Sequence, residues 1–229
     1  DLSILDLYVS LRHAATLVLI AADAGKDPAG LATLMAERRL TIWYSTPAIL
    51  TELAQFGKME RHDHSSLRYA FFAGEPFPVK QLRAVKRLLP HVQFVSLYGP
   101  TETNVCAWLP IPDEIPRERT EPFPMGSVCA RFRARVVDEN GVDVARGSVG
   151  ELAVHGDGTM QGYWNLPERT ALAFFLDADE RRWYRTGALV IEGEDGIHTC
   201  VGRRNRWSSL AKTSSRPARS DRVPAGVTT

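Results

Sequence analysis

Helical segments alternate with short apolar strands over residues 1–112, and this alternation constrains the fold more than any other feature of the chain. Helices that connect consecutive strands give a parallel sheet with helices on its faces. We therefore expect an α/β subdomain in residues 1–112, with a mostly parallel sheet and flanking helices. The predicted helices cover residues 3–12, 27–39, 47–56 and 79–88, and the predicted strands cover residues 15–20, 41–44, 67–73 and 92–97.

The pattern changes after Pro110, where a segment rich in proline and charge begins. Asn140-Gly141 between apolar runs is a strong hairpin signal. We expect residues 113–206 to form a small antiparallel, barrel-like β subdomain that ends at a hinge. Residues 207–229 are rich in Ser, Arg, Ala, Pro and Thr, so we expect a disordered tail. The predicted strands cover residues 132–138, 150–155, 188–192 and 197–201, and a helix is predicted over residues 167–175.

The composition excludes several classes of protein. Apolar content of 44% and charged content of 24% are ordinary for a globular chain, and a net charge of +1 gives no reason to expect a nucleic acid or a membrane as partner. The longest apolar run, residues 14–22, is too short to cross a bilayer. Three cysteines without metal-type spacing suit a cytoplasmic location. The chain begins at Asp1 in mid-pattern, so we expect a piece of a longer protein.

The sequence Tyr-Gly-Pro-Thr-Glu-Thr, residues 98–103, directly follows the predicted strand 92–97. It should lie at the carboxyl edge of the sheet, where open α/β sheets bind ligands. Tyr98 can stack on a base, Thr101 can donate to a phosphate oxygen, and Glu102 can hold Mg²⁺. The hexapeptide alone leaves a second interpretation open, a Gly-Pro turn that opens a helix with Thr101 as its N-cap.

Three further blocks of the sequence indicate the same kind of site. Gly74 follows the strand at 67–73 and permits close approach of a planar ligand, although a simple strand-to-helix turn is equally consistent. The other two are residues 147–152 with 162–165, and residues 183–187 with 202–205. Together the four blocks resemble the ANL superfamily of adenylate-forming enzymes, and in particular amino-acid adenylation domains, over residues 1 to about 206.

The resemblance implies that ATP and Mg²⁺ activate a carboxylic acid as an acyl-adenylate, which is then loaded on the phosphopantetheine thiol of a peptidyl carrier protein. It implies Thr101 and Glu102 as catalytic residues, with Thr101 at the phosphate and Glu102 at the metal. Such a reaction needs a metal and fixed donors to neutralise the developing charge. The implied nucleotide-binding residues are Gly74, Glu75, Pro76, Tyr98, Gly99, Thr101 and Arg203.

The resemblance also implies a substrate pocket that begins at Asp1, whose carboxylate would bind an α-ammonium group. The rest of the implied lining is apolar apart from one hydroxyl, so it should reject polar side chains. The series is similar to that of L-proline-activating enzymes, which makes a small apolar amino acid, and first of all proline, the expected substrate. Core packing remains an alternative for Leu2, Leu5 and Val105. The implied lining residues are Leu2, Leu5, Tyr44, Phe71, Ala73, Leu97, Val105 and Cys106.

Several positions depart from the family pattern. Ala188 stands where the family has an Asp that accepts both ribose hydroxyls, Asn205 replaces the hinge Asp, and the phosphate loop is missing. The abrupt change after Arg206 suggests a frameshift or a spliced end. Two alternatives therefore stay open: an acyl- or aryl-CoA ligase, against which Asp1 argues, and an inactive truncated remnant that only binds nucleotide.

Overall fold

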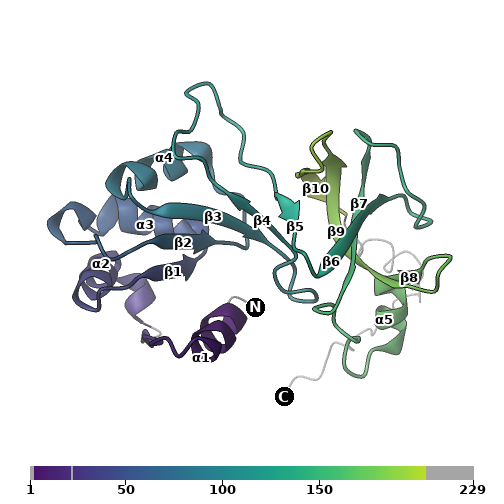
Figure 1. The fold of residues 1–229 in the computed structure, drawn as a ribbon, viewed down its shortest axis with the longest axis horizontal. Coiled ribbons are helices and arrows are strands. Elements are labelled where there is room, and N and C mark those ends of the chain that lie inside the picture. Colours follow the sequence, from purple (N-terminus) through teal and green to yellow (C-terminus); the bar gives the residue numbers. More distant parts are fainter. Residues whose placement is uncertain (1–2, 22, 205–229) are drawn as a thin grey trace, which may run out of the picture.

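The protein is described here by a computed structural model that covers residues 3–21 and 23–204. It contains two five-stranded sheets that lie side by side along the long axis (Figure 1). Sheet A has the order β1-β2-β3-β4-β5, and sheet B has the order β10-β9-β7-β6 with β8 on β9. The predictions for Asp1, Leu2, Asn205 and the disordered tail at 207–229 fall outside the described residues.

Sheet A confirms the predicted α/β class. Its first three strands, β1 (Ile42–Ser45), β2 (Tyr69–Phe72) and β3 (Gln93–Tyr98), are parallel. The sequence did not indicate two further strands, β4 (Ala107–Pro110) and β5 (Ser127–Val128). β4 pairs antiparallel with β3, and β5 pairs antiparallel with β4. The helix α2 (Pro28–Glu37) precedes β1, α3 (Pro47–Phe56) joins β1 to β2, and α4 (Val79–Leu88) joins β2 to β3.

Local chemistry fixes where these helices begin. Pro28 and Pro47 occupy first-turn positions, where the missing N–H costs nothing. The Asp27 carboxylate accepts a hydrogen bond of 3.0 Å from the Gly30 N–H at the start of α2. The helices then cover one face of sheet A, and the core between them is built from buried side chains that include Leu50, Leu82, Val85, Phe72 and Phe94.

The first predicted strand is wrong. Residues 15–20 have no regular structure, and Leu17, Leu19 and Ile20 are 38%, 83% and 39% exposed. In the described part of the chain, β1 is the edge strand of sheet A, and residues 15–20 do not pair with it. The backbone groups of this run therefore form no hydrogen bonds of a β-sheet. The predicted helix at 3–12 is confirmed as one unbroken helical run, which contains the π-helical stretch η1 (Leu5–Val9) and α1 (Ser10–Arg12) and has no buried residue.

Two short 3₁₀ turns, η2 (Ala24–Lys26) and η3 (Met59–Arg61), complete the first half of the chain. Sheet B confirms the expected antiparallel β subdomain. Its strands are β6 (Phe132–Val137), β7 (Val149–Gly156), β8 (Phe174–Leu176), β9 (Arg182–Glu192) and β10 (His198–Arg203), with α5 (Pro167–Ala173) between β7 and β8.

Three predicted boundaries in sheet B are corrected. β9 begins at Arg182 rather than at residue 188, because it pairs with β7 and β8 along its length. Phe174 and Phe175, predicted as the end of a helix, belong to β8. Asn140-Gly141 does turn the chain, but the loop that joins β6 to β7 runs on to residue 148, with only a bridge between Val137 and Asp143. Among the described residues no helix has the length and apolar character needed to cross a membrane.

Two buried histidines make the stability of this fold sensitive to acid. Burial lowers the pKa of His64 and of His198 below the value of about 6.5 for an exposed histidine. His64 Nε2 and His198 Nδ1 have no hydrogen-bond partner among the described residues, so the protonated forms would be poorly solvated. The charge of His62 lowers the pKa of His64 further.

We predict that the free energy of unfolding falls as the pH drops through about 6.5, because there the unfolded chain binds protons that the folded chain does not. The slope should approach about 1.4 kcal/mol per pH unit for each histidine. Urea denaturation between pH 5.5 and 7.5 would measure it. The double variant His64→Gln, His198→Gln should show a flatter dependence, and an unchanged slope would contradict the assignment.

Candidate nucleotide and substrate site

The candidate site lies at the carboxyl edge of sheet A, where β2 and β3 end side by side. Their parallel register pairs Phe72 with Ser96, so Gly74 and Tyr98 leave the sheet at the same edge. Gly74 has φ +98°, which favours glycine, and an added Cβ would contact only a Thr46 methyl at 3.8 Å. The backbone there has the open space that a planar base needs.

Glu75, predicted beside Gly74 in the adenine site, has its carboxylate engaged elsewhere. Its Oε1 accepts a hydrogen bond of 3.0 Å from the Ala48 N–H in the first turn of α3. This is favourable for a negative charge near the positive end of a helix. The carboxylate therefore anchors the segment after β2 to α3, and it leaves the backbone of Gly74 to Pro76 as the part that can face a base.

The Tyr98–Thr103 motif forms a tight reversal between β3 and β4. The Cys106 N–H donates to the Tyr98 carbonyl at 2.8 Å, and the Thr103 N–H donates to the Pro100 carbonyl at 3.0 Å. A Cβ on Gly99 would lie 1.6 Å from the Asn104 carbonyl oxygen, so only glycine fits. No helix follows, and the alternative in which Thr101 caps one is wrong. Thr101 is exposed on this turn.

Glu102 is half-buried and is held at one of its two carboxylate oxygens. Its Oε1 accepts a hydrogen bond of 2.7 Å from the Tyr163 hydroxyl, and its backbone carbonyl accepts from the Met160 N–H at 2.7 Å. The described residues contain no group of three His, Cys, Asp or Glu side chains that could hold a metal. The arrangement fits Mg²⁺, which is often bound by one or two carboxylates together with substrate phosphates.

Tyr98 lies where sheet A meets sheet B. It packs against a buried cluster that includes Cys106, Leu152 and Tyr184, and burial raises the pKa of its hydroxyl. The nearby Thr186 side chain and the charge of Arg203 oppose this rise in the pKa of Tyr98. The ring therefore stands between the reversal after β3 and the polar groups of β9 and β10.

Ala188 is the point at which the site does not fit a nucleotide. Arg203 stands directly opposite it in the pairing of β9 with β10, and Ala188 is 3% exposed. A methyl group cannot accept a hydrogen bond from a ribose hydroxyl. The residues present thus fit the base and the metal, but they lack the ribose acceptor at this position.

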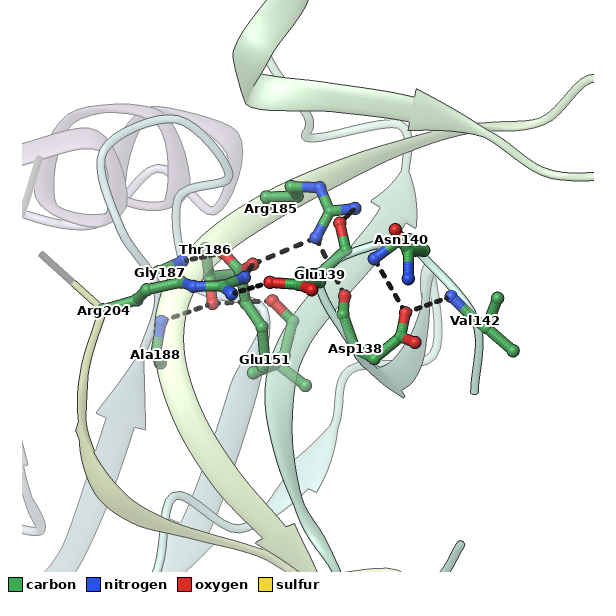
Figure 2. A network of polar contacts seen from close by, with 11 residues as sticks. Asp138, Glu139, Asn140, Val142, Glu151, Arg185, Thr186, Gly187, Ala188 and Arg204 are labelled. Carbon is green, nitrogen blue, oxygen red and sulfur yellow. Dashed lines mark hydrogen bonds and ion pairs between the residues drawn. The ribbon is translucent and has the colours of Figure 1, made fainter. Parts of the chain in front are cut away.

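A buried carboxylate supports this part of the site, as Figure 2 shows. Glu151 on β7 is 1% exposed, and its Oε2 lies 3.1 Å from Arg185 Nη1 and 3.4 Å from Arg204 Nη1. Its Oε1 accepts from the Gly187 N–H at 2.9 Å. One carboxylate therefore ties β7 to the Thr186–Ala188 segment of β9 and to the residue after β10.

The predicted substrate residues lie partly together. Tyr44 and Phe71 are paired across β1 and β2, with ring centroids 6.3 Å apart. By strand alternation they face away from the core that the helices cover, on the same side as Leu97. Burial and the charge of Asp6 raise the pKa of Tyr44 to about 12, which places Asp6 near this hydroxyl.

The remaining predicted lining residues are more dispersed. Leu5 lies in η1, Ala73 is buried after β2, and Val105 is half-buried in the reversal before β4. Cys106 is buried in the cluster beneath Tyr98, and burial raises the pKa of its thiol to about 11, so it is a neutral packing group at pH 7. Asp1 and Leu2 are outside the described residues.

Sequence reasoning missed four residues of the site. Glu151 and Tyr163 lie inside the blocks Gly-Glu-Leu and Gly-Tyr, where a charged or polar residue between apolar neighbours was the available signal. Thr186 was part of a recognised block but had no expected contact. Nothing in the sequence distinguished Asp6 from an exposed helical carboxylate.

Comparison with solved structures agrees with this architecture. A protein described as IdnL1 superposes with a TM-score of 0.81 at 25% identity, over 88% of this chain and 42% of its own. The amide bond synthetase McbA from Marinactinospora thermotolerans superposes with a TM-score of 0.67 at 30% identity, over 77% of this chain and 34% of its own. The fold of this chain is thus shared with proteins of solved structure, over about two fifths or less of their own length.

The model of the AMP-binding enzyme family matches residues 1–164, and the chain belongs to this family. An L-proline–[L-prolyl-carrier protein] ligase from Streptomyces coelicolor is 38% identical over 214 residues, 92% of this chain and 39% of the relative. A ligase of the same description from Pseudomonas fluorescens is 34% identical over 90% of this chain and 39% of its own length. The D-alanine–D-alanyl carrier protein ligase from Lactiplantibacillus plantarum is 30% identical over 89% of this chain and 40% of its own. The chain therefore spans about two fifths of these relatives.

Proposed function

We propose that this chain forms the middle part of an amino-acid adenylating ligase. The full-length protein would convert an amino acid and ATP to an aminoacyl-adenylate and pyrophosphate, and would then load the acyl group on the phosphopantetheine thiol of a carrier protein. Similarity to carrier-protein ligases for proline and for D-alanine supports this reaction class. The observation that carries the proposal is the pair Tyr98 and Glu102 on one tight reversal at the edge of sheet A.

In this proposal each group has a separate task. The backbone of Gly74, Glu75 and Pro76 lines the adenine, the Tyr98 ring stacks on it, and Gly99 lets the chain pass close by. Thr101 donates to phosphate, and Arg203 reaches the ribose. Bound at Glu102, Mg²⁺ would neutralise phosphate charge. The division into residues 1–112, 113–206 and 207–229 belongs to the same proposal.

L-Proline is the proposed substrate. Tyr44, Phe71 and Leu97 offer a compact, mostly apolar surface that suits a small ring, and Asp1 would bind the amine. The two relatives at 38% and 34% identity are both described as proline ligases. An apolar pocket separates similar small substrates by only about 1–3 kcal/mol per methylene. Other small apolar amino acids should therefore react more slowly rather than fail to react.

Amino-acid-dependent exchange of pyrophosphate into ATP by the full-length protein would test the proposal. We expect the highest kcat/KM with proline, and lower values with alanine and valine. Exchange with benzoate but not with proline would instead support the aryl-acid ligase, because such a substrate has no amine for Asp1. No exchange with any acid would support the inactive remnant.

Restoring the missing carboxylate gives a prediction with a gain of binding. In the proposed site, the new carboxylate of the variant Ala188→Asp would stand opposite Arg203 and accept ribose hydroxyls. Because Ala188 is 3% exposed, circular dichroism must first show that the variant folds. A hydrogen bond to a charged acceptor contributes about 1.5–3 kcal/mol, so ATP should bind on the order of 10–100 times more tightly. Calorimetry on the full-length protein would measure the dissociation constant. Ala188→Asn, which keeps the shape without the charge, should gain less, and unchanged ATP affinity in a folded Ala188→Asp variant would contradict the predicted ribose site.

A further inference from the structure

The hydrogen bond between Tyr163 and Glu102 joins two segments that are far apart in the sequence. Glu102 lies on the reversal after β3 of sheet A, and Tyr163 lies in the loop between β7 and α5 of sheet B. The Tyr163 hydroxyl donates to Glu102 Oε1 at 2.7 Å, and the Met160 N–H donates to the Glu102 carbonyl at 2.7 Å. The loop before α5 therefore holds both the side chain and the backbone of Glu102.

Tyr163 is itself fixed on three sides. Its N–H donates to Thr170 Oγ1 at 2.9 Å, and the guanidinium carbon of Arg169 lies 4.4 Å from the centroid of its ring. Gly162 allows this close approach to α5, because a Cβ there would lie 2.8 Å from Thr170 Cγ2. The backbone N–H of Tyr163 is hydrogen-bonded, one face of its ring is covered, and its hydroxyl is hydrogen-bonded. The side chain therefore has little freedom to rotate away from Glu102.

This geometry leaves the two carboxylate oxygens of Glu102 in different situations. Oε1 accepts the hydrogen bond from the Tyr163 hydroxyl, while within residues 3–21 and 23–204 no hydrogen bond or ion pair is made to Oε2. A carboxylate fixed in this way presents its second oxygen in one direction, which lowers the entropy lost when an ion is bound there. Partners that orient a metal ligand typically contribute 10–100-fold to metal affinity.

We propose that Tyr163 is a positioning residue that orients the Glu102 carboxylate toward the divalent cation of the nucleotide complex. The inference rests on the proposed function, since it needs Glu102 to meet the metal. Thr170 and Arg169 act one step further out, by holding Tyr163. The loop before α5 thereby couples sheet B to the metal site of sheet A.

Electron paramagnetic resonance of Mn²⁺ would test this in the full-length protein with ATP present, using Mn²⁺ as a probe for Mg²⁺. In Tyr163→Phe the Mn²⁺ dissociation constant should rise on the order of tenfold, because the ring and its packing stay while the hydroxyl is lost. Tyr69→Phe is the matched control, since Tyr69 is 38% exposed on β2, and it should leave Mn²⁺ affinity unchanged. The dissociation constant for ATP without metal should stay unchanged in both variants.

The variant Glu102→Gln tests the metal role of Glu102 separately from the positioning role of Tyr163. If Glu102→Gln weakens Mn²⁺ binding and Tyr163→Phe does not, the metal role of Glu102 holds and the positioning role of Tyr163 is wrong. If neither variant changes Mn²⁺ binding, the proposed metal site fails, and the inference about Tyr163 fails with it. An equal loss in Tyr163→Phe and Tyr69→Phe would also overturn the inference.

Discussion

Glu151→Ala should lower the free energy of unfolding by about 3–5 kcal/mol, because it leaves the side chain of Arg185 buried without its carboxylate. Arg185 is 12% exposed and Glu151 is 1% exposed, so solvent can replace little of the lost ion pair. Of its hydrogen bonds within the described residues, Arg185 would keep only those to the Asp138 and Glu139 carbonyls. The change also leaves the Gly187 N–H without its acceptor. Since domains of this kind are stable by only about 5–15 kcal/mol, a large part of the stability would disappear.

Glu192→Ala is the matched control for this prediction. Glu192 also lies in sheet B and pairs with an arginine, Arg146, at 3.0 Å, but this pair is exposed. Exposed pairs contribute about 0–1 kcal/mol, so this variant should melt close to the wild type. Urea denaturation of both variants would measure the difference. Similar losses in the two variants would show that burial of Glu151 has no special weight.

Gly99→Ala should damage both stability and the nucleotide site. The added Cβ would lie 1.6 Å from the Asn104 carbonyl oxygen and 2.5 Å from its carbon, and backbone atoms cannot move aside as a flexible side chain can. Overpacking of this kind typically costs about 1–3 kcal/mol, and more where backbone must shift. The reversal that carries Thr101 and Glu102 would have to open, so ATP affinity should fall together with stability.

Gly25→Ala is the corresponding control, because an added Cβ there meets no described atom within 4 Å. It should change stability by only a few tenths of a kcal/mol, or raise it slightly by restricting the unfolded chain. Thermal melting and calorimetric titration with ATP would measure both effects. Wild-type ATP affinity in Gly99→Ala would mean that the reversal is not part of the nucleotide site.

The sequence predicted best those elements whose signals are local. α3 and α4 have the predicted bounds, since proline at or before the first turn and an apolar period of 3.6 residues mark them without reference to the rest of the chain. The strand at 15–20 failed, because an apolar run becomes a strand only when another strand pairs with it. β4 and β5 were missed for the same reason, since their pairing with β3 and with each other decides them.

In the candidate site, too, the sequence indicated features that depend on local signals and missed contacts between distant residues. The turn at Gly99 and the position of Tyr98 at the sheet edge follow from a strand followed by Gly-Pro, and the sequence indicated both. The contacts of Glu151 join residues 34, 36 and 53 positions away, and that of Tyr163 joins a residue 61 positions away. The Glu151 contacts depend on how distant strands pair within sheet B, and the Tyr163 contact depends on how the two sheets meet. No local pattern in the sequence indicates either arrangement.

We propose that adenine binds beside Tyr98 at the carboxyl edge of sheet A. Photoaffinity labelling of the full-length protein with an azidoadenine analogue of ATP, followed by mass spectrometry of the peptides, tests it most directly. We expect adducts within residues 74–76 and 98–99, and their loss in the presence of excess ATP. Adducts found only outside these residues, and equally displaced by ATP, would contradict it.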